Sequence, residues 1–124
     1  MVITTSTLTN IKESALSELD DLTYMGFGSD GTTPVVTDTT LGSEEDRNTF
    51  DETSIKSIGA GTYDFSGLLG LTEANSTTIR EVGLFNSSSG GTMRCRELLT
   101  TAISKTSSID LSVGIRVTVT VENV

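Results

Sequence analysis

The residues that could bind a cofactor are three glycines near the middle of the first half of the chain. Gly26, Gly28 and Gly31 form a literal G-x-G-x-x-G after a predicted strand. In dinucleotide-binding proteins this turn opens a helix whose N-terminal amides meet the pyrophosphate. Here a Thr-Thr-Pro sequence follows and no βαβ unit surrounds the motif. We therefore interpret the three residues as turn glycines and expect no cofactor.

A second group of candidates is acidic. Asp30, Asp38, Glu44, Glu45 and Asp46 could supply oxygen ligands to calcium, which takes six to eight of them. Their spacing resembles no EF-hand loop, so a solvated acidic loop is favoured, and cation binding by this loop stays open. Paired carboxylates could hydrolyse glycosides, but any pair among 17 acidic residues would be an arbitrary choice. We expect no metal site and no catalytic pair.

The residue types that are missing narrow the chemistry further. The chain has no His, which removes the usual general base and the commonest zinc ligand. Its single Cys95 permits neither an internal disulfide nor a thiolate zinc cluster, and a buried structural thiol is expected. These absences exclude most familiar hydrolase mechanisms. We expect a protein that is not an enzyme and has no small-molecule substrate.

Charge bears on the possible partners. With 17 acidic and 8 basic residues among 124, the formal net charge is −9. Phosphate backbones and anionic lipid heads would repel such a chain, so we expect neither nucleic acid nor a membrane surface as a partner. The chain has no run of about 18 apolar residues, and its first ten residues lack the basic and apolar regions of a signal peptide. We expect the mature chain to start near Met1.

Two further polar patterns have ordinary explanations. Asn75 and Asn86 each begin a match to the glycosylation acceptor pattern, but chance matches are expected in a chain rich in Ser and Thr, and the question stays open. Four arginines lie on predicted strands, and we expect them to face acidic side chains across strands rather than bind an anionic ligand. They are Arg80, Arg94, Arg96 and Arg116, with Glu81, Glu97 and Glu122 as the acidic candidates.

The elements that position these residues follow from hydrophobic periodicity. Apolar residues recur every three or four positions from Leu8 to Leu22, which predicts an amphipathic helix over about 10–21. A short strand from Leu22 to Phe27 and a long exposed connection over about 28–47 come next. The remainder, about 48–124, reads as β structure. Its expected strands are Phe50–Ile58, Thr62–Leu71, Thr77–Phe85, Thr92–Leu99 and Ile109–Val121, with a hairpin loop over 86–91.

The final strand has the clearest pattern. Val113, Ile115, Val117, Val119 and Val121 alternate with polar residues or glycine, as in a strand with one buried and one solvated face. The whole chain is therefore expected to be a single domain that is mainly β (α+β). Its core would be an antiparallel β-sheet or sandwich with one N-terminal amphipathic helix.

Several segments resemble parts of virion proteins from tailed viruses. The segments Met25–Pro34 and Thr37–Glu44, which lead to Arg47, resemble the opening of small virion proteins. Thr78–Phe85 resembles the "I-R-E-hydrophobic-G-L-F" strand of the N-terminal, baseplate-attached domain of tail fibre and tail-collar proteins. Ser104-Lys105-Thr106 before the last Val-rich strand extends the likeness over almost the whole chain. Such fibres usually continue into a shaft, whereas this sequence stops at Val124.

The resemblance implies a non-enzymatic structural component of a tailed virus particle. We expect a tail or baseplate adaptor that connects or anchors fibre or receptor-binding components. The alternatives are a capsid decoration, turret or head-fibre protein on the capsid surface, and a cellular adhesive or carbohydrate-binding β domain. The expected partners are other virion proteins and the chain itself, as a homo-oligomer that forms a trimer or a ring.

The strand Thr77–Phe85 is expected to form the subunit interface. Strict alternation puts Ile79, Glu81, Gly83 and Phe85 on one face and Arg80, Val82 and Leu84 on the other, so both faces are partly apolar. One face would be covered by the N-terminal helix and the other by a neighbouring subunit. The interface residues expected on this basis are Ile79, Val82, Leu84 and Phe85.

Overall fold

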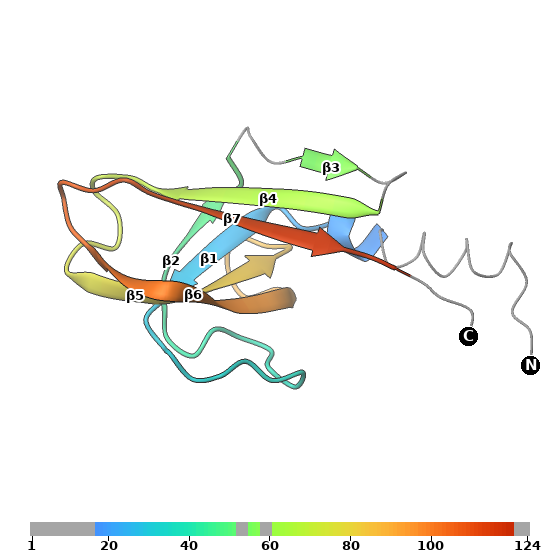
Figure 1. The fold of residues 1–124 in the computed structure, drawn as a ribbon, viewed down its shortest axis with the longest axis horizontal. Coiled ribbons are helices and arrows are strands. Elements are labelled where there is room, and N and C mark those ends of the chain that lie inside the picture. The colour runs from blue at the N-terminus through green and yellow to red at the C-terminus, as the bar shows by residue number, and fades with distance from the viewer. Residues whose placement is uncertain (1–16, 52–54, 58–60, 121–124) are drawn as a thin grey trace, which may run out of the picture.

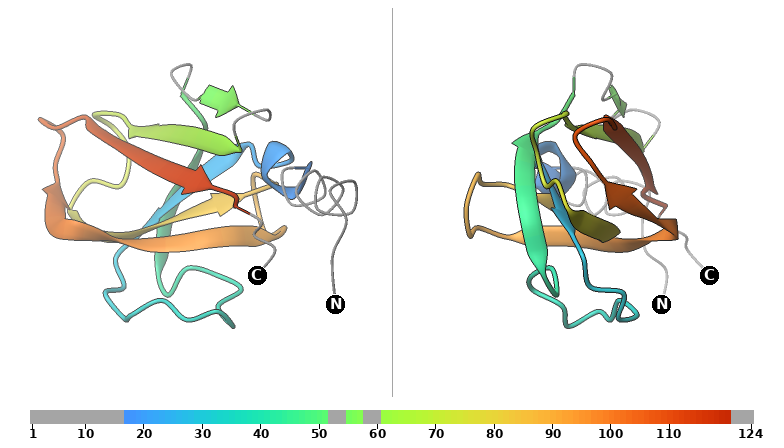
Figure 2. Two further views of the ribbon diagram at one scale, coloured as in Figure 1. Left: turned by 45° about the vertical axis from the view of Figure 1, so that its right-hand side comes forward. Right: turned by 90° about the vertical axis from the view of Figure 1, so that its left-hand side faces the viewer.

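The chain folds into two antiparallel β-sheets that pack face to face. A computed structural model describes residues 17–51, 55–57 and 61–120. The strands are β1 (Tyr24–Gly28), β2 (Glu44–Thr49), β3 (Ile55–Ser57), β4 (Thr62–Leu69), β5 (Thr77–Phe85), β6 (Met93–Lys105) and β7 (Leu111–Thr118). One sheet has the order β2-β1-β5-β6 and the other β3-β4-β7. Figures 1 and 2 show the two layers, with β4 and β7 in one and β5 and β6 in the other. The predicted mainly β, antiparallel class is confirmed.

The core lies between the two sheets. Alternation along β1 turns Met25 and Phe27 inward, where they meet Tyr63 and Phe65 of β4; all four side chains are at most 1% exposed. The Phe65 ring lies 5.7 Å from that of Tyr63 and 5.0 Å from that of Phe50. Tilted aromatic pairs at such separations add to the burial of apolar area.

The last strand keeps the predicted alternation but is less deeply buried than expected. Val113, Ile115 and Val117 of β7 are half-buried against the core, whereas Gly114 and Arg116 are exposed. The inward face of β7 is only half covered because β7 is an edge strand of its sheet. Val119 follows the same pattern, and Val121 lies outside the described residues.

The loop predicted over about 28–47 is shorter in the structure. Residues 44–47 belong to β2, which pairs antiparallel with β1. The prediction that the connection extends to about residue 47 was wrong, since β2 begins at Glu44. The strand was missed because it contains no apolar residue and so has no hydrophobic pattern. Its pairing rests on backbone hydrogen bonds at the free edge of β1, which need no buried side chains. The connection that remains is 29–43, which we call the overhang loop; it projects from the lower side of the molecule in Figure 1.

Other element boundaries differ in smaller ways. Residues 17–20 are helical, and the rest of the predicted helix lies outside the described residues. The expected strand Phe50–Ile58 is represented by β3, and β6 runs on to Lys105 instead of ending at Leu99. The hairpin loop at 86–91 is confirmed. Gly90 and Gly91 have φ values of 59° and 70° there, a backbone conformation that glycine adopts without steric cost.

The two faces of β5 are assigned differently from the prediction. The β5–β6 pairing shifts between Ile79 and Glu81, where six residues of β6 span the register from Ile103 to Leu98. Ile79 consequently joins Val82 and Leu84 in the core instead of sharing a face with Glu81. A bulge breaks simple alternation, so strict period-two counting across it fails.

Candidate functional site

A buried carboxylate organises the outer side of the four-stranded sheet. Glu81 of β5 has no exposed surface, and four donors surround it. One oxygen, Oε1, accepts from the Gly42 N–H and from Arg96 Nε, each at 2.8 Å. The other, Oε2, accepts from the N–H groups of Asp30 and Ser43, each at 2.9 Å. A buried carboxylate with this many partners is stable in its charged form.

The three backbone donors come from the two ends of the overhang loop. Asp30 follows β1, and Gly42 and Ser43 precede β2, so one side chain fixes both ends of a loop that lies across the sheet. The loop also closes on itself, because Ser29 donates its N–H to the Ser43 carbonyl at 2.9 Å. Glu81 therefore holds the overhang loop in one position relative to the sheet.

Arg96 on β6 extends this network toward the middle of the loop. Its side chain is only 5% exposed; Nη1 lies 3.3 Å from Asp38 Oδ2, and Nη2 lies 3.7 Å from Asp30 Oδ2. The guanidinium thus joins the buried Glu81 to two carboxylates of the loop. This confirms the expected cross-strand pairing for Arg96 and Glu81. Arg94 and Arg116 instead pair with Glu18 and Asp64, and Glu122 lies outside the described residues.

The electrostatics of the network favour the ionised groups. Burial raises the pKa of Glu81, but the hydrogen bonds from Arg96 and from three backbone N–H groups outweigh it, so the net pKa lies below the ordinary 4.5. The Arg96 pKa is raised, first by its hydrogen bond to Glu81. Both groups are therefore charged throughout the neutral range. Such a pair is suited to fixing structure, because a proton-transfer group needs a pKa near the working pH.

Glycine at position 28 makes room for the carboxylate. A Cβ placed on Gly28 would lie 2.5 Å from Glu81 Oε2 and 2.6 Å from the Ser43 carbonyl oxygen. Gly26 is restricted as well, since its Cβ would lie 2.7 Å from the Phe85 ring. Both residues belong to β1, and the described residues that follow it, 29–51, contain no helix. The G-x-G part of the motif thus serves close packing within a strand, which corrects our interpretation of these two residues as turn glycines.

Substituting Gly28 with alanine tests this close approach. We expect the free energy of unfolding to fall by about 1–3 kcal/mol, the usual cost of an overpacked site. Thermal unfolding followed by circular dichroism measures it. Gly90→Ala is unsuitable as a control because of its positive φ, whereas Gly114→Ala is suitable, since the nearest atom to its Cβ would be 3.9 Å away. Equal effects of Gly28→Ala and Gly114→Ala would contradict the packing argument.

The outer face of β5 after Glu81, at Gly83 and Phe85, is also covered by other parts of the chain. Leu41 of the overhang loop, 5% exposed, lies over Gly26 and Gly83. The Arg47 guanidinium carbon lies 3.5 Å from the centre of the Phe85 ring, a cation–π contact. Arg47 is held there because it donates to the carbonyls of Ser87 and Gly90 at 3.0 and 2.8 Å.

The four residues predicted for the subunit interface are buried within the chain. Ile79, Val82, Leu84 and Phe85 are 0%, 1%, 0% and 2% exposed. A side chain without accessible surface has no atoms to offer a second chain, so this structure places the four residues in intramolecular packing. The expected covers of β5 were the N-terminal helix and a neighbouring subunit. In the described residues the β3-β4-β7 sheet covers the inner face, and the overhang loop with Arg47 covers the outer face.

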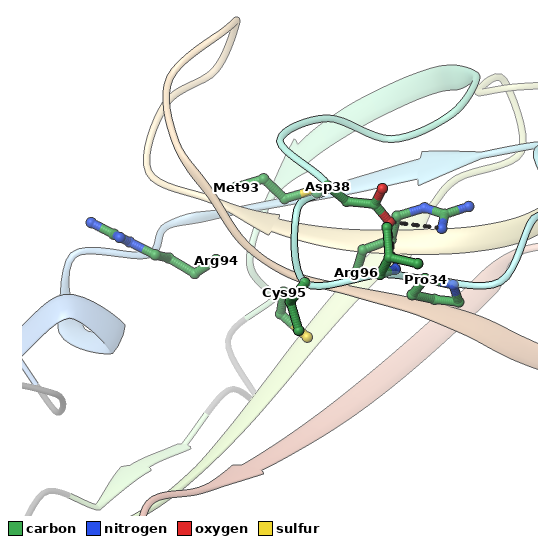
Figure 3. A pocket seen from close by; sticks show the side chains of 8 residues that line it. Pro34, Asp38, Met93, Arg94, Cys95 and Arg96 are labelled. Atoms are coloured by element: carbon green, nitrogen blue, oxygen red, sulfur yellow. Dashed lines mark hydrogen bonds and ion pairs between the residues drawn. The ribbon is translucent and has the colours of Figure 1, made fainter.

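The tip of the overhang loop presents apolar side chains to solvent. Val35 is 58% exposed and Val36 is fully exposed, at 104% of the reference value. Asp38 holds the turn between them and the sheet, since its Oδ2 accepts from the Val35 N–H at 3.0 Å. A groove of about 360 Å³ lies between the tip and β6 (Figure 3). Its lining consists of Pro34, Val35, Val36, Asp38 and the β6 residues Met93 to Arg96.

Cys95 borders this groove and is poorly suited to nucleophilic chemistry. Burial, followed by the charge of Glu97, raises the pKa of its thiol from 9.0 to about 11. At pH 8 a two-unit increase leaves about a hundredfold less thiolate than in an exposed cysteine. We expect Cys95 in the folded protein to react with a maleimide at least about tenfold more slowly than after unfolding in guanidinium. Equal rates in the two states would contradict a protected thiol.

The remaining candidates from the sequence have local structural roles. Asp30 and Asp38 face Arg96, and Glu44 pairs with Arg47 at 2.6 Å. Within the described ranges, no group of three or more acidic, Cys or His residues could hold a metal ion. Asn75 donates to the Leu71 carbonyl at 2.8 Å and accepts from the buried Lys105 amine at 2.9 Å, so its amide is engaged within the fold. Asn86 accepts from the Thr92 N–H in the hairpin loop.

Sequence reasoning missed the network around Glu81. The available signal was one acidic residue between the apolar residues Ile79 and Val82 in a strand that is otherwise buried. An acidic residue at a core position implies a partner, and Arg96 was among the candidates. The backbone donors were not visible because they come from a loop whose path the sequence does not specify.

Comparisons with known proteins add no assignment to this geometry. No model of a known protein family matches the chain, and no curated protein sequence matches it. Among the described residues, no helix is long and apolar enough to cross a membrane.

Proposed function

We propose that this protein is a non-enzymatic structural component of a tailed virus particle. In this proposal it is a tail or baseplate adaptor that connects or anchors fibre or receptor-binding components. The resemblance of Thr78–Phe85 and Met25–Pro34 to virion proteins supports it. The two segments are also in contact, because Glu81 in the first accepts a hydrogen bond from the N–H of Asp30 in the second.

The observation that carries the proposal is the exposed apolar tip on an anchored loop. Val35 and Val36 are adjacent and exposed, so together they offer an apolar contact to a partner, and burying one valine contributes about 1.5–3 kcal/mol. The Glu81 and Arg96 network fixes the loop before binding, so little conformational entropy is lost when the tip is covered. An adaptor that joins two protein components needs an attachment point of this kind.

Location in an intact particle tests the proposal. Particles purified from an infected culture would be imaged by electron cryomicroscopy, and the fold described above would be fitted to the density. The expected result is density for this chain at the tail or baseplate, in contact with a fibre or receptor-binding protein. Density on the capsid surface would overturn the tail assignment in favour of the decoration alternative. Absence of the chain from the particle would overturn the virion assignment itself.

A variant of the tip tests the attachment point separately. Val35→Asp with Val36→Asp is expected to reduce incorporation of the chain into particles at least about tenfold, because two charges would enter an apolar contact. Thr37→Asp with Thr39→Asp is the matched control, since both threonines are exposed on the same loop and the charge change is identical. Equal incorporation of the two variants, measured by quantitative mass spectrometry of particles, would show that the tip is not the attachment point.

A further inference from the structure

The four sheet edges of this fold are not equally protected against pairing with another strand. Natural sheets block their edges with charge, short length or bulges. The β2 edge carries four consecutive charged residues, Glu44 to Arg47, and β3 has three residues. The β6 edge is interrupted by the register shift between Leu98 and Ile103. Three of the four edges therefore have a recognisable protective feature.

The edge of β7 has none of these features. It is eight residues long and pairs with β4 from Leu111 to Thr118 without a register shift. Its one charged residue, Arg116, is bound to Asp64 of β4 at 2.7 and 3.1 Å. Because alternate backbone groups of a strand point to opposite sides, half of the β7 N–H and C=O groups point away from β4.

We propose that this edge pairs with β7 of a second copy of the chain. The two strands would run antiparallel about a two-fold axis and join two three-stranded sheets into one continuous sheet. This inference concerns association of the chain with itself, and it holds whether or not the protein is part of a virus particle.

Charge favours a second copy at this edge. Each copy carries a net charge of −9, so two copies repel each other over most of their surfaces. The segment from Leu111 to Thr120 contains no acidic residue and one arginine. Two copies can therefore meet along β7 with little repulsion between acidic side chains of that strand.

The strand is also complementary to itself when reversed. In an antiparallel pair centred on Gly114, Arg116 lies opposite Ser112; in a pair centred on Ile115, it lies opposite Gly114. Neither register places Arg116 against Arg116. In both registers the half-buried Val113 faces an apolar residue of the other strand, Ile115 or Val117. Apolar cross-strand pairs of this kind stabilise a sheet.

The inner side of this edge has room for the added strand. A groove of about 300 Å³ lies between β6 and β7, with Val82, Leu99, Val113 and Ile115 among its lining residues. An added strand at β7 would place its own apolar side chains beside these residues, on the inward side of the extended sheet. The half-buried side chains that line this groove would then lose their remaining contact with water.

Sedimentation equilibrium over a concentration series tests this inference. We expect a reversible species of twice the 13.1 kDa chain mass. Its dissociation constant should fall as salt is raised, since screening weakens repulsion between the acidic copies. A species that stays monomeric up to millimolar concentration at every salt concentration would overturn the inference. A trimer or larger ring would also overturn it, because pairing about a two-fold axis at one edge closes at two copies.

A charge variant locates the interface. Ser112→Lys with Gly114→Lys adds two cations beside Arg116 on the exposed face of β7, so like charges meet in either register. Both positions are exposed, and a Cβ at Gly114 meets no atom closer than 3.9 Å. We expect dimerisation to weaken at least about tenfold, although the variant lowers the net negative charge of each copy.

The matched control makes the same charge change on β6, the edge strand of the other sheet. Thr101→Lys with Ser104→Lys alters two exposed positions of β6 and should leave the dissociation constant within about twofold of the unaltered chain. Thermal unfolding confirms that both variants fold. If the control weakens dimerisation as much as the β7 variant does, or if the β7 variant folds and dimerises normally, pairing through β7 is wrong.

Discussion

Replacing Glu81 with leucine is expected to lower the free energy of unfolding by about 3–5 kcal/mol, the usual cost of removing one partner of a buried ion pair. The substitution leaves Arg96, whose side chain is 5% exposed, without its closest carboxylate. It also leaves the N–H groups of Asp30, Gly42 and Ser43 without their acceptor. Chemical denaturation measures the loss, which is a large share of the stability of a small domain.

Two controls separate charge from shape at this position. Glu81→Gln keeps the shape of the side chain but replaces one accepting oxygen with an NH₂ donor. We therefore expect a loss of unfolding free energy that is smaller than that of Glu81→Leu. Glu81→Leu with Arg96→Leu removes both charges, and its cost should be smaller than the sum of the two single costs because the residues are coupled. A Glu81→Leu loss below about 1 kcal/mol would contradict the role assigned to the network.

The Glu81 carboxylate also makes the free energy of unfolding depend on pH. The pKa of Glu81 is lower in the folded chain than its ordinary value of 4.5, so folding favours the ionised form. This contribution is fully present above about pH 4.5 and is lost as the pH falls through the folded pKa. We expect the unaltered chain to lose more stability than Glu81→Leu as the pH is lowered below 4.5. Parallel losses in the two proteins would show that other carboxylates dominate acid unfolding.

Replacing Phe65 with alanine is expected to destabilise the domain by about 3–5 kcal/mol, because it removes a large side chain from the centre of the core. Phe65 is 1% exposed and packs against Tyr63 and Phe50. It lies on β4, the central strand of the three-stranded sheet, which contacts β1 and β2 of the other sheet. The midpoint of guanidinium unfolding measures the effect.

Phe65→Leu is the matched control for this substitution. Leucine fills most of the volume, so its cost should be less than half that of alanine. Leu68 on the same strand is 41% exposed, and Leu68→Ala should cost less than about 1 kcal/mol. If Phe65→Ala were no more destabilising than Leu68→Ala, the core would not lie between the two sheets.

Several features of this fold follow from local sequence alone. The alternation of Val113, Ile115 and Val117 predicted the orientation of β7, and the run from Thr77 to Phe85 predicted the bounds of β5. The cluster at 86–91 predicted the hairpin loop. These predictions succeed because side-chain period and turn chemistry are properties of neighbouring residues, which a sequence displays directly.

Other features were decided only by tertiary structure. The four charged residues of β2 carry no strand pattern, and they form a strand because the edge of β1 offers backbone partners. The bulge opposite Arg80 moved Ile79 into the core and left Glu81 facing outward. Glu81 itself could have paired with any of several cations. Its actual partners are Arg96 and the ends of a loop 38 to 51 residues away in sequence. Sequence determines which groups need a partner, because burial of charge is costly for any fold. Which partner meets that need depends on how the chain brings distant segments together, and no local pattern records it.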